Sequence, residues 1–210
     1  MDVITAIKKE RGRYRVTVND SEDIIVPLSL LRERPLKEGQ PIDLAEYDNW
    51  LMVRQYRFAL DRAVGYLAAR ARSRKEIEDK LLRAGYRPST VEMVLYKLQR
   101  ENLLDDADFA RQWVESRANH KLGRSRIAQE LRRKGVSQEE AEEALSVIED
   151  DDQLAGAVSL AEKAAARIKP GEDIRKAYNR IAAMLARRGY SWDIAKEALR
   201  QAFADVDVDE

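Results

Sequence analysis

The feature that most constrains the fold of this chain is an apolar pattern that occurs three times at a nearly fixed spacing. Each copy is anchored on a glycine, with apolar residues eight and four positions before it and six and ten positions after it. Because the order of these positions is kept from copy to copy, the pattern predicts a repeated supersecondary unit. The three copies are Ile77, Leu81, Gly85, Val91 and Leu95; Ile127, Leu131, Gly135, Ala141 and Leu145; and Ile181, Leu185, Gly189, Ala195 and Leu199.

The spacing within each copy predicts one helix that ends at the glycine and another that begins a few residues later. Residues four apart lie on one face of a helix, so the two apolar positions before the glycine form a buried stripe. A glycine just past a helix accepts the left-handed conformation that β-carbons disfavour. We expect capping boxes at Ser73 with Glu76, Ser89 with Glu92 and Ser137 with Glu140, and half a box at Ser191, where Ile194 takes the acidic position.

The helical period runs from about Tyr47 almost to the end of the chain and predicts nine helices in three three-helix units. The predicted fold class is mainly α, with three tandem three-helix repeats that form an elongated, curved array behind a small N-terminal β-rich region. The expected helices are 53–71, 74–84, 89–100, 106–119, 124–134, 138–149, 153–168, 173–187 and 192–204.

Residues 1–46 differ from the rest of the chain. Val3–Ile7, Tyr14–Val18 and Ile24–Leu28 are short and β-branched, and turn residues separate them, so a small β-meander is expected that packs on the helices. We expect one helical turn over Leu28–Glu33. The predicted organisation is an extension over 1–46, repeats over 47–102, 103–152 and 153–204, and a frayed tail over 205–210.

Composition narrows the class of protein. The 210 residues include 38 basic and 38 acidic side chains and no cysteine, which excludes disulfides and thiolate metal sites and favours a reducing compartment. No apolar run approaches the roughly 18 residues of a membrane span, and the first residues lack a signal-peptide core. A cytoplasmic protein without a membrane partner is therefore expected, and a monomer is favoured.

Charge is distributed unevenly along the balanced chain. Residues 117–134 hold seven basic residues and one acid, Glu130; residues 175–188 hold five basic residues and no acid; residues 138–152 hold eight acids and no base. Attraction to helix dipoles explains basic residues near helix ends. It does not explain the crowding of Arg117, Lys121, Arg124 and Arg126, which either contacts a partner or forms a solvated face.

No catalytic, cofactor or metal site is predicted. The single histidine, His120, lies in a polar helix end, and each glycine near a helix boundary stands alone rather than in a phosphate-binding loop. Asp105, Asp106 and Asp108 could hold a divalent cation, but acids are also expected where a helix begins. A chain without a convergent acid–base pair is expected to act by binding.

Two stretches resemble signatures of the RecX family of recombination regulators, and together with weaker flanks the resemblance covers most of the chain. One departure is Ile77, where the family usually has leucine. The third copy, from Ile181 to Leu199, is similar but less distinctive, and Leu36 to Gln40 resembles the N-terminal extension of longer members. The matching residues are Tyr66, Leu67, Arg70, Arg72, Ser73, Glu76, Leu81 and Gly85 in the first copy, and Leu104, Asp105, Asp106, Phe109, Ala110, Arg117, Gly123, Ile127, Glu130, Leu131, Lys134, Gly135 and Val136 in the second.

The resemblance implies a non-enzymatic regulator that binds the groove of the RecA–single-stranded-DNA filament. Such a protein inhibits or destabilises the filament and so limits recombination and the co-protease activity of the SOS response. The alternative is a helical-repeat protein that binds DNA directly, without RecA. Neutral net charge and the lack of aromatic residues among the arginines speak against it. The residues expected to contact a partner are Arg70, Arg72, Arg74, Arg117, Lys121, Arg124, Arg126, Arg132 and Arg133.

Overall fold

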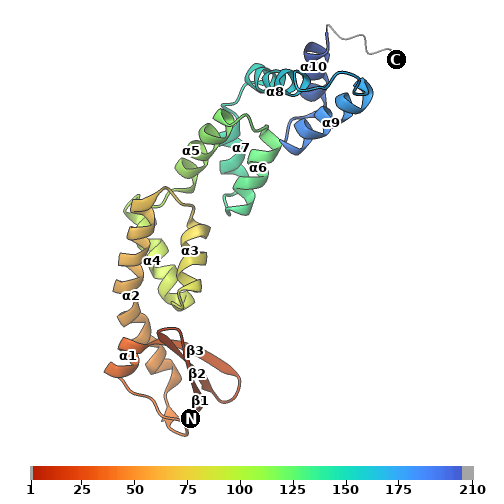
Figure 1. Ribbon diagram of the computed structural model, residues 1–210. Helices are drawn as coiled ribbons and strands as arrows, with labels where there is room; N and C mark the ends of the chain where they lie inside the picture. Colours follow the sequence, from red (N-terminus) through yellow and green to blue (C-terminus); the bar gives the residue numbers. More distant parts are fainter. Residues whose placement is uncertain (1, 205–210) are drawn as a thin grey trace. The chain divides into compact units, whose positions relative to one another are not determined.

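The computed structural model describes residues 2–204 and divides into two compact units, Met1–Asp105 and Asp106–Glu210 (Figure 1). The predicted tail over 205–210 lies outside the described residues. The first unit holds a sheet and the first three-helix repeat, and the second unit holds the other two repeats. The described elements are mainly helical, as the sequence predicts.

The N-terminal region is a four-stranded antiparallel sheet in the order β3-β2-β1-β4. The first three strands form the predicted meander, and β4 pairs with the outer side of β1 through Asp2 and Ile42. The predicted helical turn is present as α1. The bounds are β1 Asp2–Glu10, β2 Arg13–Val18, β3 Glu22–Pro27, α1 Leu28–Glu33 and β4 Pro41–Ile42.

Helix α2 (Leu44–Ala69) serves two hydrophobic cores. Its first half supplies Tyr47 and Leu51 to the core of the sheet, and its second half supplies Ala59 and Ala63 to the core of the first repeat. The expected start of this helix at residue 53 is wrong. The Asp43 carboxylate caps the helix by accepting a hydrogen bond from the backbone N–H of Glu46, so the helix begins under the sheet.

The first repeat is completed by α3 (Arg74–Arg83) and α4 (Pro88–Arg100). The Ser73 hydroxyl caps α3 by accepting from the N–H of Glu76, as expected. The expected cap at Ser89 is wrong, because Pro88 occupies the first turn and Arg87 becomes the N-cap without a side-chain hydrogen bond. Proline suits the first helical turn since it has no N–H to satisfy.

The described part of the second unit, up to residue 204, contains six helices. Ser137 and Glu140 form the predicted reciprocal capping box, and Ser191 accepts from the N–H of Ile194 as the half box predicts. Phe109 and Phe203 are buried, and the partly buried rings of Trp113 and Tyr178 pack against them, so these four aromatic residues belong to the core. The helices are α5 Asp106–Asn119, α6 Arg124–Arg133, α7 Gln138–Leu145, α8 Asp150–Ala165, α9 Ile174–Arg187 and α10 Trp192–Ala202.

The three anchor glycines close their helices in the same way. Gly85, Gly135 and Gly189 have φ of +90°, +80° and +88°. In each copy the residue after the glycine donates its N–H to the carbonyl five residues back, as from Val136 to Leu131 at 3.2 Å. This is the pattern of a Schellman motif, so the repeated sequence marks a repeated helix stop.

Candidate partner-binding surfaces

The predicted arginines of the first repeat shape the turn between α2 and α3. Arg70 forms a two-pronged ion pair with Glu76, with both N–O distances at 3.0 Å, and this partner raises the pKa of the Arg70 guanidinium. Arg72 donates to the Tyr66 carbonyl at 3.0 Å, and Arg74 binds Glu92 at 2.8 Å. These contacts fix the direction in which α3 leaves the turn.

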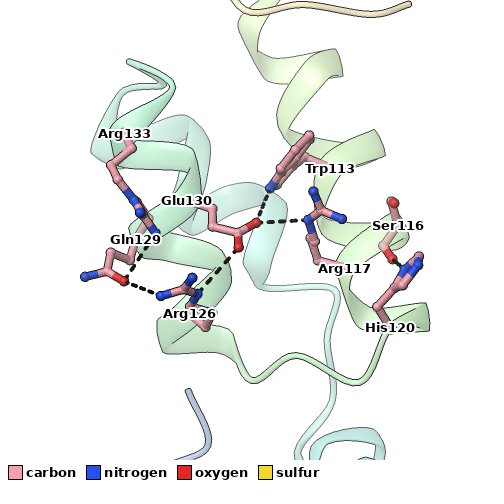
Figure 2. Close-up of polar contacts among 8 residues, drawn as sticks. All are labelled: Trp113, Ser116, Arg117, His120, Arg126, Gln129, Glu130 and Arg133. Atoms are coloured by element: carbon pink, nitrogen blue, oxygen red, sulfur yellow. Dashed lines mark hydrogen bonds and ion pairs between the residues drawn. The ribbon is translucent and has the colours of Figure 1, made fainter. Parts of the chain in front are cut away.

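In the second repeat, Glu130 of α6 gathers the side chains that project from two helices (Figure 2). One of its carboxylate oxygens accepts from the indole N–H of Trp113 at 3.1 Å and from Arg117 at 2.9 Å, and the other faces Arg126 at 3.5 Å. The Arg117 guanidinium also lies 4.0 Å from the centre of the Trp113 ring. A single acid therefore orients Arg117 and Arg126, and the Trp113 ring also supports Arg117.

Lys121 and Arg124 contact helix α8 and the segment just before it. The ammonium of Lys121 donates to the Ser159 hydroxyl at 2.6 Å. Arg124 pairs with the Asp150 carboxylate and donates to the Ile148 carbonyl. Both residues thus help to join the second repeat to α8. These contacts divide the four crowded basic residues into two pairs. Arg117 and Arg126 lie around Glu130, whereas Lys121 and Arg124 contact α8 and the segment before it.

The joint between the second and third repeats is a close backbone contact. The N–H of Gly123 donates to the Arg188 carbonyl at 2.9 Å, and the N–H of Ser125 donates to the Gly189 carbonyl at 3.3 Å. The side-chain oxygen of Gln153, which is 5% exposed, accepts from the N–H of Arg124 at 2.9 Å. A β-carbon on either glycine would overlap backbone atoms of the other repeat.

A groove of about 670 Å³ lies between α6, α7 and the end of α9 within this unit. We call it the α6–α9 groove. Three arginines line it, Arg126, Arg132 and Arg187, against a single acid, Glu142. Its floor is apolar, formed by Ala128, Val136, Ala141, Leu145 and Ala186. Such a groove suits an anionic partner that also has an apolar surface.

Arg132 and Arg187 are the groove cations that are most available to a partner. Both side chains are exposed, and among residues 2–204 neither has a hydrogen bond or an ion pair. Among the described residues, the side chain of Arg133 bonds only to Gln129, at 3.3 and 3.5 Å (Figure 2). Of the nine predicted residues, Arg132 and Arg133 therefore combine exposure with weak or no internal ties, and Arg126 is half-buried with contacts to Gln129 and Glu130 that are 3.3 Å or longer.

Arg187 was not among the predicted contact residues. Its position near a helix end had a sufficient explanation in the helix dipole, although five basic residues over 175–188 marked the segment as basic. Reversing Arg124 to glutamate would break its ion pair with Asp150 and its hydrogen bond to the Ile148 carbonyl, so we expect the thermal stability to fall.

Residues 2–204 contain no group of three or more His, Cys, Asp or Glu side chains placed to hold a metal ion. None of the described helices is both long enough and apolar enough to cross a membrane. His120 is exposed at the end of α5, where its ring nitrogen lies 2.7 Å from the Ser116 carbonyl (Figure 2).

Taken together, these features define a protein of tandem three-helix repeats with an arginine-lined groove between two of them. Family models described as the first, second and third three-helix domains of RecX match residues 59–98, 105–145 and 150–199. The chain belongs to the RecX family of regulatory proteins.

Individual relatives agree with the family models. The regulatory protein RecX of Clostridioides difficile is 30% identical over 99% of this chain and 100% of its own length. That of Mycobacteroides abscessus is 34% identical over 87% of this chain and 84% of its own length.

Two solved structures have the same fold. A crystal structure of a regulatory protein RecX superposes with a TM-score of 0.65 at 25% identity, over 96% of this chain and all of the other. A crystal structure of RecX from Lactobacillus salivarius gives a TM-score of 0.65 at 29% identity, over 72% of this chain and 99% of the other.

Proposed function

We propose that this protein binds in the groove of the RecA–single-stranded-DNA filament and inhibits or destabilises it. By doing so it limits recombination and the co-protease activity of the SOS response. The protein acts without catalysis, in the cytoplasm, as a monomer whose surfaces stay open to the filament. Membership of a family of regulatory proteins supports the regulatory class.

The observation that carries the proposal is the α6–α9 groove. A filament of protein and DNA presents phosphates and acidic side chains next to apolar protein surface, and the groove offers three guanidinium groups over an apolar floor. The two cations without internal partners, Arg132 and Arg187, can bind a new anion without giving up an existing contact. Glu142 lines the groove, and we expect the acids of residues 138–152 to face basic loops of the filament.

The test is the single-stranded-DNA-dependent ATP hydrolysis of RecA, with this protein titrated from far below one copy per RecA protomer. We expect hydrolysis to fall at substoichiometric amounts, because one bound molecule in the groove or at a filament end affects many protomers. A fall only near one copy per protomer, or none, would contradict filament binding of this kind.

A parallel measurement separates filament binding from competition for DNA. Binding to bare single-stranded DNA weakens steeply with salt, because each phosphate contact releases counterions. We expect inhibition of RecA to keep a part that resists 200 mM salt. If inhibition and bare-DNA binding were lost together over the same salt range, the alternative of direct DNA binding without RecA would replace the proposal.

A further inference from the structure

A second hollow, in the first unit, has a chemistry of its own. It measures about 660 Å³ and lies where the β1–β2 turn and the end of β3 meet the middle of α2 and the turn after α3. We call it the β–α hollow. Four arginines line it and one acid, Glu10, which is already paired with Arg13 at 3.3 Å and Arg15 at 2.7 Å. The arginines are Arg11, Arg13, Arg62 and Arg83.

Two of these arginines are without an internal anion. Arg11 and Arg62 are exposed, and within residues 2–204 their side chains make no hydrogen bond and no ion pair. Arg62 lies over the ring of Tyr86, with its guanidinium carbon 5.9 Å from the ring centre. Exposed guanidinium groups that line one hollow form a site for anions.

An exposed aromatic ring completes the lining. Phe58 is 56% exposed and lines the hollow one helical turn before Arg62. Flat rings next to guanidinium groups are the arrangement by which proteins bind single-stranded nucleic acid, because a base stacks on the ring while its phosphate pairs with the cation. An acidic peptide supplies carboxylates but no flat face for Phe58, so the ring favours a nucleic acid strand.

Gln55 and Gly85 connect the two sides of the hollow, the sheet and the first repeat. Gln55, which is fully buried, donates to the Ile25 carbonyl of β3 at 3.5 Å and accepts from the N–H of Arg87 at 3.2 Å. Gly85 lets the turn after α3 approach the sheet so closely that an added β-carbon would lie 2.6 Å from the Arg13 guanidinium. These contacts join the sheet to the first repeat, so that residues of β3, α2 and the turn after α3 line one hollow.

We propose that the β–α hollow binds a short stretch of single-stranded nucleic acid, with one base stacked on Phe58 and the flanking phosphates on Arg62 and Arg11. This site is separate from the α6–α9 groove and does not require the recombinase. The protein thus has two arginine-lined surfaces for anionic partners, one in each unit, and the one in the first unit distinguishes a strand with bases from a strand without them.

The experiment uses the full chain, no recombinase, and a fluorescein-labelled strand of fifteen thymidylates followed by anisotropy at several salt concentrations. The protein carries Arg132→Gln and Arg187→Gln throughout, so binding in the α6–α9 groove does not mask the effect. Phe58→Ala should weaken binding about tenfold, within the range known for loss of base stacking. Arg62→Gln should weaken binding and reduce the slope of log K against log salt by about 0.7.

Matched controls lie on the same helix outside the hollow. Val53→Ala removes an apolar side chain that is 61% exposed, and Arg57→Gln removes one exposed positive charge. Neither should produce the loss caused by its counterpart. Phe58→Trp keeps a flat ring and should bind at least as tightly as the parent. Circular dichroism confirms that every variant is folded.

A strand of fifteen abasic units carries the same phosphates without bases and gives the sharpest comparison. We expect Phe58→Ala to leave its binding unchanged. Equal effects of Phe58→Ala on both strands, or an effect no larger than that of Val53→Ala, would overturn the proposal. So would a fifteen-residue polyglutamate peptide whose binding depends on Phe58 when that of the thymidylate strand does not.

Discussion

Both units use the same two devices to join their parts, but one joint is tight and the other is loose. Each joint has a left-handed glycine that follows the second helix of a repeat, Gly85 in the first unit and Gly189 in the second. Each also has a buried glutamine, Gln55 or Gln153, whose side chain accepts from a backbone N–H at the start of a helix. The repeated sequence therefore supplies a joint as well as a helix stop.

The two joints differ in the atoms that face the glycine. Gly189 meets the backbone of Gly123 and Arg126, and backbone hydrogen bonds connect the two repeats directly. The three atoms nearest to a β-carbon added at Gly85 belong to side chains, with the tip of Arg13 at 2.6 Å and a methyl group of Ile25 at 3.0 Å. A backbone contact cannot move aside, whereas the end of an arginine can. Two glycines at equivalent positions of the repeat therefore differ in how well the structure can accommodate an added side chain. The β–α hollow lies beside the loose joint.

The largest effect is expected for Gly189→Ala. The new β-carbon would overlap the backbone of Arg126 and would also strain a residue at φ +88°. Left-handed strain costs about 1–2 kcal/mol and overpacking about 1–3 kcal/mol. We expect the second unit to lose about 2–5 kcal/mol, read as loss of amide hydrogen-exchange protection in α6 and α8–α10.

Two controls separate strain from contact at this joint. Gly171→Ala has the same strain, with φ +81°, but nothing lies within 4 Å of the new β-carbon. Gly123→Ala has the contact without the strain, since its φ is −73°. If Gly189→Ala cost no more than Gly171→Ala, the joint would be loose and the comparison would fail.

Gly85→Ala should have a smaller effect, about 1–2 kcal/mol on the first unit, because the strain remains while the Arg13 side chain can turn away. Hydrogen exchange in α3 and β3 is the measurement. Gly39→Ala, with φ +78° and open space around it, is the matched control in the same unit. A loss as large as that of Gly189→Ala would show that the two joints are equally rigid.

Tyr190→Phe tests a single polar contact of the tight joint. The Tyr190 hydroxyl donates to the Lys121 carbonyl at 2.9 Å, and this carbonyl keeps a second donor, Arg188, at 3.4 Å. Removal of one such bond should therefore cost about 1 kcal/mol in the free energy of unfolding, measured in urea. No measurable change would mean that the backbone contacts alone hold the repeats together.

The smallest effect at neutral pH is expected at Tyr47, under the sheet. Burial raises the pKa of its phenol to about 12, and its hydroxyl is buried without a hydrogen-bond partner. Because the unfolded chain loses this proton near pH 10, stability should fall between pH 10 and 12. Tyr47→Phe should be nearly neutral at pH 7 and should make that fall shallower. An unchanged alkaline slope in urea titrations would contradict this account.

Much of the fold follows from local patterns in the sequence. The three glycines, the apolar stripes and the serine caps act within one helical turn, so their consequences can be predicted without tertiary knowledge. The start of α2 could not be predicted in this way. Asp43 caps the helix and Tyr47 packs into the core of the sheet, and both roles depend on the presence of the sheet. Nothing in the sequence near Gln55 and Gln153 distinguishes them from ordinary polar residues. Their burial follows from the packing of a sheet or a second repeat against them.

The candidate sites were less predictable for the same reason. Glu130 stood out as the single acid in a basic stretch, and it is the residue around which Arg117 and Arg126 are ordered. The α6–α9 groove and the β–α hollow bring together residues from distant segments, as Arg132 with Arg187 or Arg11 with Phe58. The apolar periodicity of one helix does not predict which distant residues lie close together in space.

The most direct test of the account compares two double variants in the inhibition of RecA ATP hydrolysis. Arg132→Gln with Arg187→Gln removes two charges from the α6–α9 groove, and Lys163→Gln with Arg167→Gln removes two exposed charges from the end of α8. We expect the first pair to raise the concentration for half-inhibition about tenfold, the loss of roughly one charge-assisted contact, and the second to leave it unchanged. Equal effects of the two pairs would contradict the assignment of the groove as the filament-binding surface.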